Sequence, residues 1–180
     1  MSTPEIQTLD SQIVYRNRWM TVREDRIQRA DGSPGLYGVV EKAHFAIIAA
    51  LHEGCLQMVE QYRYPVRQRF WELPQGAWET REVDPLTLAT AELREETGWT
   101  AGRMQHAGEL FLAYGFCTQT YNVFFATDLQ PGERQLDAEE QGLVCRAIPV
   151  ETVQAMILDG TIRDASTVAA FGLLRLKGWI

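Results

Sequence analysis

Three glutamates, Glu92, Glu95 and Glu96, are the residues of this 180-residue chain best suited to chemistry. At 100° per residue they share one arc of a helix about 100° wide. Like charges at these spacings repel by about 0.2–0.5 kcal/mol per pair, and Arg94 points elsewhere on the wheel. Hard cations such as Mg²⁺ take carboxylate oxygens together with phosphate oxygens and water. The spacing is therefore typical either of a metal site or of a solvated acidic face.

The helix that carries these glutamates has clear boundaries. Asp84 suits the N-cap, Pro85 suits the first helical position, and Gly98 is a natural stop. These signals predict a helix over 85–97. Its apolar arc predicts a core-facing side, which consists of Leu86, Ala89, Leu93 and Thr97.

Strands should outnumber helices in the rest of the chain. Alternating residues over 13–42, with a turn at Asp31-Gly32, predict a small antiparallel sheet. A buried hairpin is expected over 44–60, with further strands at 108–113, 120–129 and 143–148. Two helices should follow, the first from Pro149 and the second capped by Asp164. This order favours an α+β fold, with helices packed on both faces of a mixed sheet.

Composition limits the class of protein. The length suits one domain with a full core, or a core domain with a small appendage. A net charge of −7 argues against binding to nucleic acid, which needs basic patches. No apolar run reaches the roughly 18–20 residues of a membrane span, and the first ten residues do not look like a signal peptide. We therefore expect a cytoplasmic protein with no membrane partner.

The segment before the acidic helix adds a family resemblance. Trp71-Glu72-Leu73-Pro74-Gln75-Gly76 leads, after five residues, to Glu82, and eight residues then precede Ala91-Glu92-Leu93-Arg94-Glu95-Glu96-Thr97-Gly98. This resembles the Nudix box, and the chain is identified as a member of that hydrolase family. The family pattern has seven residues in place of the eight, and it has Arg where this chain has Ala91. The resemblance implies a Nudix-type α/β/α sandwich with a mixed sheet, after a small N-terminal antiparallel sheet.

Other segments point to one branch of the family. Gln61-Tyr62-Arg63-Tyr64-Pro65 and the Glu72–Gly76 segment are similar to the Gln-Tyr-Arg…Glu-Leu-Pro-Ala-Gly stretch of the ADP-ribose pyrophosphatases. Residues 160–165 resemble the C-terminal Gly-Lys/Glu-Ile-x-Asp/Asn-Ala segment of the same branch. Relatives acting on GDP-mannose and other nucleotide sugars share much of this frame, so such a substrate is an alternative.

The resemblance also implies roles for individual residues. Glu92 and Glu96, assisted by Glu95, would hold Mg²⁺ or Mn²⁺, with a backbone carbonyl near Gly76 as a further ligand. Arg63 would grip a phosphate, because its planar fork matches two phosphate oxygens; a salt bridge to Glu60 or Glu72 is the alternative. Glu139 and Glu140, in the acidic loop, are the candidates for a general base or an extra metal ligand. Trp19, Tyr37 and Tyr114 are the candidate aromatic platforms for adenine.

The function implied is metal-dependent hydrolysis of a nucleoside diphosphate derivative, with ADP-ribose the leading substrate. Water would attack one phosphorus, giving AMP and ribose 5-phosphate. A weakly active nucleotide-sugar sensor is the alternative, supported by Ala91 and opposed by the retained glutamates. Residues 1–42 would form the region for dimerisation and part of the substrate pocket, and residues 43–180 the hydrolase domain. The expected assembly is a homodimer, because so thin a sheet is not stable alone.

Overall fold

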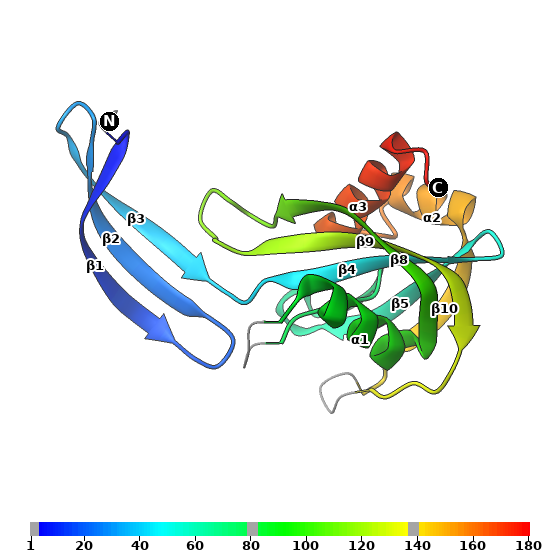
Figure 1. Cartoon of the computed structure of the whole chain (residues 1–180). Coiled ribbons are helices and arrows are strands. Elements are labelled where there is room, and N and C mark those ends of the chain that lie inside the picture. Colours follow the sequence, from blue (N-terminus) through cyan, green and yellow to red (C-terminus); the bar gives the residue numbers. More distant parts are fainter. Residues whose placement is uncertain (1–3, 79–82, 137–140) are drawn as a thin grey trace.

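The computed structural model describes residues 4–78, 83–136 and 141–180, and their strands form two sheets (Figure 1). The smaller sheet is antiparallel in the order β1-β2-β3. Residues 17–20 join its first two strands, and the expected turn at Asp31-Gly32 joins the second strand to the third. The bounds of its strands are β1 (Ile6–Arg16), β2 (Thr21–Arg29) and β3 (Pro34–Glu41).

The larger sheet is mixed, because β4 and β9 run parallel whereas the other pairs are antiparallel. In the described residues its order is β10-β5-β4-β9-β8, and two short strands pair beside β5 and β4. Its strands are β4 (Phe45–His52), β5 (Cys55–Arg63), β6 (Gln68–Glu72), β7 (Gln75–Gly76), β8 (Trp99–Phe111), β9 (Thr120–Pro131) and β10 (Val144–Pro149). A 3-10 turn, η1 (Tyr64–Val66), joins β5 to β6.

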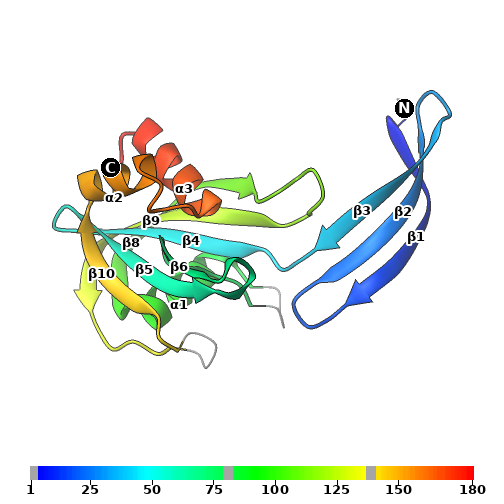
Figure 2. The same cartoon turned by 180° about the vertical axis from the view of Figure 1, so that it is seen from behind.

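Helices cover both faces of the larger sheet, as Figures 1 and 2 show from opposite sides. Helix α1 (Pro85–Thr97) packs on one face, while α2 (Val150–Leu158) and α3 (Ala165–Leu176) lie on the other. The predicted α/β/α sandwich with a mixed sheet is confirmed. None of the helices in the described ranges is long and apolar enough to cross a membrane.

Strand β4 separates two hydrophobic clusters, because its side chains alternate between the faces. Ala46, Ile48 and Ala50 pack with Leu93 of α1, whereas Ile47 and Ala49 belong to the cluster beneath α2 and α3. The small alanines on the α1 side let that helix approach the sheet closely. The acidic helix is thereby held against the middle of the sheet.

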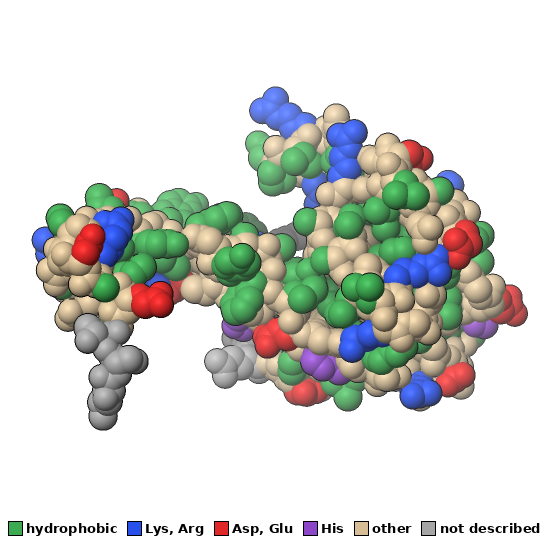
Figure 3. Space-filling model, turned by 90° about the horizontal axis from the view of Figure 1, so that it is seen from above, with side chains coloured by type: hydrophobic (Ala, Val, Ile, Leu, Met, Phe, Trp, Pro, Cys, Tyr) green, Lys and Arg blue, Asp and Glu red, His purple; other side chains and the backbone are tan. Residues whose placement is uncertain are grey.

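The N-terminal sheet extends from the body as an arm (Figures 1 and 3). Its end is joined to the body by a short parallel bridge, in which Val40 N donates to Phe116 O (2.8 Å) and Thr118 N donates to Val40 O (3.0 Å). Every residue of β1 is exposed, and several large apolar side chains of the arm face solvent. They include Ile6, Leu9, Ile13, Val14, Tyr15 and Leu36.

Candidate active site

Helix α1 begins and ends where its capping signals predict. Asp84 accepts a hydrogen bond from Thr87 N, and Gly98 ends the helix with φ of 78°, a left-handed value that suits glycine. The expected core face needs one correction: Leu86 is exposed, and Leu88 is buried in its place. The face in contact with the sheet is therefore rotated toward Leu88, and this rotation carries two glutamates inward.

Glu92 and Glu96 are buried, with 5% and 1% of their surfaces exposed. The solvated-face interpretation of these two residues is therefore wrong. Burying a carboxylate is costly unless partners satisfy its oxygens. For Glu96 one partner is the backbone N–H of Gln75, which donates to Oε2 at 3.0 Å. Glu95, between them, is half-buried and accepts from Gln135 N through its backbone carbonyl.

The segment that covers these carboxylates is 73–76, which leads into and forms β7. Gly76 lies so close to Glu92 that a Cβ on it would stand 2.2 Å from Glu92 Oε2. The carboxylate thus occupies the space a side chain would fill. This packing gives a structural reason for glycine at position 76 and places backbone groups of the segment beside two buried carboxylates.

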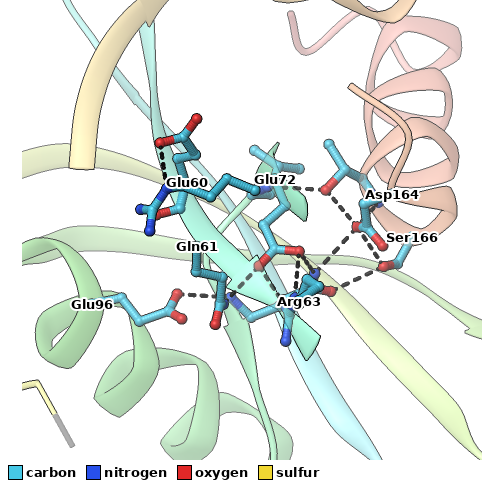
Figure 4. A network of polar contacts seen from close by, with 11 residues as sticks. Glu60, Gln61, Arg63, Glu72, Glu96, Asp164 and Ser166 are labelled. Carbon is cyan, nitrogen blue, oxygen red and sulfur yellow. Dashed lines mark hydrogen bonds and ion pairs between the residues drawn. The ribbon is translucent and has the colours of Figure 1, made fainter. Parts of the chain in front are cut away.

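A polar network continues from this segment across the end of the sheet (Figure 4). Arg63 donates to Glu72 through two nitrogens, Nη2 to Oε1 at 2.5 Å and Nε to Oε2 at 3.3 Å, and Gln61 Nε2 also donates to Oε1 at 2.7 Å. Burial raises the pKa of Glu72, and the adjacent Arg63 opposes that shift. The salt bridge considered as an alternative for Arg63 is formed with Glu72, whereas Glu60 pairs with Arg69.

The far end of the network is the N-terminus of α3. Asp164 caps this helix as predicted, accepting from Thr167 N at 2.8 Å, and its Oδ2 also accepts from Ser166 Oγ and Gln75 Nε2. Thr167 Oγ1 in turn accepts from Leu73 N at 2.9 Å. Segment 73–76 is therefore bonded to α3 on one side and to Glu96 of α1 on the other.

A cavity of about 580 Å³ opens beside this network. Arg63 and Glu72 line it from the sheet, and Arg163 and Asp164 line it from the loop before α3. Pro65, Val66 and Phe70 supply apolar walls. A pocket with apolar walls and a few charged groups is the usual form of a small-molecule site.

None of the three predicted aromatic platforms lines the cavity that contains Arg63. Trp19 is 42% exposed and lines a smaller cavity of about 220 Å³ with residues 41–43, where the Arg18 guanidinium lies 4.4 Å from its ring. Tyr37 donates from its hydroxyl to Gly115 O at 3.1 Å, beside the loop that carries Tyr114. All three rings are exposed, so the structure does not use them as core residues.

Glu139 and Glu140, the predicted base candidates, lie outside the described residues. The part of the same loop that precedes them packs on the end of α1. Arg134 donates from Nε to Glu96 O at 2.8 Å and from Nη2 to Leu143 O at 3.2 Å. These contacts hold Arg134 against the C-terminal end of the acidic helix.

Glu92 and Glu96 fit a hard divalent cation, because such ions prefer carboxylate and backbone oxygens as ligands. The close approach of Gly76 to the Glu92 carboxylate places both kinds of oxygen near each other. Across residues 4–78, 83–136 and 141–180, no three His, Cys, Asp or Glu side chains converge tightly enough to hold an ion by themselves. The backbone, water and substrate could supply further oxygens. This suits Mg²⁺, which keeps several waters and binds through one or two carboxylates.

Known proteins resemble this arrangement over the whole chain. A family model described as "NUDIX domain" matches residues 42–171, and one described as "Nucleoside diphosphate sugar hydrolase N-terminal domain" matches residues 6–40. An ADP-ribose pyrophosphatase of Mycobacterium tuberculosis is 30% identical over 94% of this chain and 83% of its own length. The ADP-ribose pyrophosphatase of Bacillus subtilis is 26% identical over 98% and 96%, respectively.

A solved structure titled "Crystal structure of ADP compounds hydrolase" superimposes with a TM-score of 0.85, covering 100% of both chains at 21% sequence identity. At that identity it supports the fold alone. The chain belongs to the Nudix family, as its sequence indicated. It is a pyrophosphohydrolase of that family, and its candidate site includes polar groups to which the motifs assign no role.

Those additional groups are Gln75, Asp164, Ser166, Arg163 and Arg134, which the fold brings to the site from three distant segments. Their sequence signals are weak. Asp164 is visible as a helix cap, and its second role as an acceptor for Gln75 depends on how α3 meets segment 73–76. Gln75 stands where the motif of the ADP-ribose pyrophosphatases has Ala, and only this difference marks the position in the sequence.

Proposed function

We propose that the protein hydrolyses ADP-ribose to AMP and ribose 5-phosphate with the help of Mg²⁺ or Mn²⁺. The observation that carries the proposal is the pair of buried carboxylates, Glu92 and Glu96, packed against Gly76 and the N–H of Gln75. Nudix hydrolases generally use divalent metals. The substrate is supported by the names of two relatives, which align with 94% and 98% of this chain.

In this proposal Glu92 and Glu96, assisted by Glu95 and a backbone carbonyl near Gly76, hold the metal. When bound, divalent ions neutralise pyrophosphate charge and lower the pKa of a coordinated water. The oxygen of a water forms a bond to one phosphorus, and the bond from that phosphorus to the bridging oxygen breaks. The water proton passes to a base, for which Glu139 and Glu140 stay the predicted candidates. The bridging oxygen leaves on the second phosphate.

Arg63 is the proposed phosphate ligand from the sheet. Its side chain is 42% exposed and lines the 580 Å³ cavity, while Glu72 fixes the plane of its guanidinium through two bonds. A guanidinium held in one orientation loses little freedom when it binds phosphate. The paired carboxylate also reduces the positive charge of the cavity, so Arg63 contributes direction more than net charge.

A homodimer would bring the adenine platforms into the same site. Trp19 and Arg63 line different cavities in one chain, and the arm exposes several large apolar side chains (Figure 3). We propose that a second copy covers these side chains and supplies Trp19 or Tyr37 from its arm, or Tyr114 from the loop between β8 and β9, to the pocket. Light scattering at micromolar concentration should give twice the chain mass of 20.5 kDa, and a monomer mass would contradict the proposed dimer.

The deciding experiment is a substrate screen with the purified full chain. ADP-ribose, GDP-mannose, other nucleotide sugars and dinucleoside polyphosphates should each be assayed with Mg²⁺, with Mn²⁺ and with excess chelator. We expect ADP-ribose to have the highest kcat/KM, with AMP as a product, and activity to disappear in chelator and return with Mg²⁺. Preference for another nucleotide sugar would replace the substrate, and full activity in chelator would refute the mechanism. Binding without turnover would favour the sensor alternative.

A further inference from the structure

Gln75 is the residue that joins the proposed metal site to the rest of the network. Its backbone N–H donates to Glu96 Oε2, while its side chain points into the network on the other side of segment 73–76. Nε2 donates to Glu72 Oε2 at 3.1 Å and to Asp164 Oδ2 at 3.2 Å. Oε1 lies 3.0 Å from Ser166 Oγ, whose single hydroxyl hydrogen is shared between Oε1 and Asp164 Oδ2. One side chain therefore bonds to β6 and to the N-terminus of α3.

The orientation of this amide is determined by its neighbours. Two carboxylate groups, from Glu72 and Asp164, face the same end of the Gln75 side chain. Only an NH₂ group offers two hydrogens to satisfy both, and a rotated amide would place its oxygen against two acceptors. The hydroxyl of Ser166 then lies where the amide oxygen accepts. The chemistry at this position specifies glutamine over an apolar or acidic side chain of similar size.

The hydrogen bonds of the Gln75 side chain restrict the backbone of segment 73–76, against which Glu92 and Glu96 pack. Segment 73–76 is also tied to α3 by the hydrogen bond from Leu73 N to Thr167 Oγ1, and Leu73 packs in the cluster beneath α3. Any drift of Gln75 away from Asp164 would move both its own N–H relative to Glu96 and Gly76 relative to the Glu92 carboxylate. Partners that orient metal ligands in this way commonly change metal affinity about 10–100-fold when removed.

We propose that Gln75 is a positioning residue: its side chain anchors segment 73–76 between Glu72 and the N-terminus of α3 and thereby sets the affinity of the Glu92–Glu96 site for a divalent cation. The inference rests on the proposed function, because it takes these two carboxylates as metal ligands. Gln75 itself touches neither the cation nor the substrate through its side chain.

The test uses two matched substitutions in the full chain, Gln75→Met and Gln61→Met. Both replace a glutamine by an apolar side chain of similar length, and both remove a hydrogen bond to Glu72, the Gln61 bond being the shorter at 2.7 Å. They differ because Gln61 lies on β5 and, among the residues that the structure describes, is hydrogen-bonded to Glu72 and not to segment 73–76. Binding of Mn²⁺ is measured from the loss of the free-ion electron paramagnetic resonance signal, without substrate and well below the melting temperature.

We expect Gln75→Met to raise the Mn²⁺ dissociation constant about tenfold or more. Gln61→Met should lower the melting temperature and leave Mn²⁺ binding as in the wild type. With saturating Mn²⁺, Gln75→Met should recover most of kcat with little change in KM for ADP-ribose. If Gln75→Met bound Mn²⁺ as tightly as the wild type, or if both variants weakened binding equally, the proposal would be overturned.

Gln75→Asn is the second variant, in case Gln75→Met does not fold. It keeps the amide and shortens the side chain by one methylene, so that it no longer spans both carboxylates, and it should weaken Mn²⁺ binding in the same direction by a smaller factor. Unchanged binding in Gln75→Asn would also count against the inference. Glu96→Gln distinguishes a failure of the proposed metal site from a failure of the role proposed for Gln75. If Glu96→Gln leaves Mn²⁺ binding intact, the proposed function fails; if it abolishes binding while the Gln75 variants bind normally, the inference alone fails.

Discussion

Gly76→Ala tests the contact between segment 73–76 and the acidic helix with one added carbon atom. A Cβ at this position would stand 2.2 Å from Oε2, 2.4 Å from Cδ and 2.6 Å from Oε1 of Glu92. Since non-bonded carbon atoms settle about 3.5–4.0 Å apart, the carboxylate would have to retreat by roughly 1 Å or more. Glu92 is only 5% exposed, so it has little room to do so without moving the helix or the segment.

The expected effects on chemistry and on stability are comparable in free energy, because a 100-fold loss of rate corresponds to about 2.7 kcal/mol. A displacement of about 1 Å in a catalytic group costs on the order of 100-fold in rate, whereas overpacking by one methyl costs about 1–3 kcal/mol. We therefore expect turnover of Gly76→Ala to fall about 100-fold at a temperature where the variant is still folded. The assay is the initial rate of AMP release from ADP-ribose, beside thermal melts in chelator and in Mg²⁺.

Gly172→Ala is the matched control. This glycine lies on α3, and a Cβ there would meet no atom within 4 Å apart from its own helix. It should raise stability by up to about 1 kcal/mol, because alanine is the better helix former, and leave turnover unchanged. Combining Gly76→Ala with Glu92→Asp, whose shorter side chain makes room for the methyl, should recover part of the lost metal-dependent stabilisation. Wild-type turnover in Gly76→Ala would show that the Glu92 carboxylate is not where the reaction needs it.

Three further predictions concern charged residues. Glu96→Gln should lower turnover by orders of magnitude, yet keep the metal-free protein as stable as the wild type or up to about 1 kcal/mol more stable, with the order reversed by Mg²⁺ in thermal melts. Near-normal turnover would remove Glu96 from the site. Arg63→Lys keeps the charge but loses the planar fork, so the affinity for ADP-ribose should weaken, and an unchanged affinity would remove Arg63 from the pocket. Because burial raises the pKa of Glu72 above 4.5, protonation of this carboxyl stabilises the folded state, and that contribution to stability is lost as pH rises through the folded-state pKa. Glu72→Gln should therefore gain in stability relative to the wild type between acid and neutral pH in urea titrations, and a constant difference would contradict this pKa shift.

Local signals in the sequence were sufficient to locate α1 and its glutamates. Asp84, Pro85 and Gly98 act within a few residues of themselves, so their effect does not depend on the rest of the fold. The sequence was a weaker guide to which face of the helix is buried. A wheel shows which residues share a face, but the burial of Glu92 and Glu96 depends on segment 73–76 packing over them from outside the helix.

The short strands β6 and β7 were not predicted as strands. They span five and two residues, too few for alternation to be distinguished from a loop, and they exist because β5 and β4 offer edges for pairing. The cavity was missed for a related reason. Arg63 and Arg163 are a hundred positions apart, and only the packing of α3 against the sheet brings both to its wall.

The central place of β4 has a consequence for the order in which the molecule opens. Both hydrophobic clusters share this strand, so separating either helical layer from the sheet exposes β4 to water and weakens the other layer as well. The body should consequently lose its amide protection against hydrogen exchange as a single cooperative unit. The N-terminal arm, held by the bridge at Val40 and Cys117 and by residues 42–44, lacks such a shared core and should exchange first. The acidic helix should thus open together with the slowest-exchanging part of the chain, so we expect its carboxylates to stay in place when the arm alone opens.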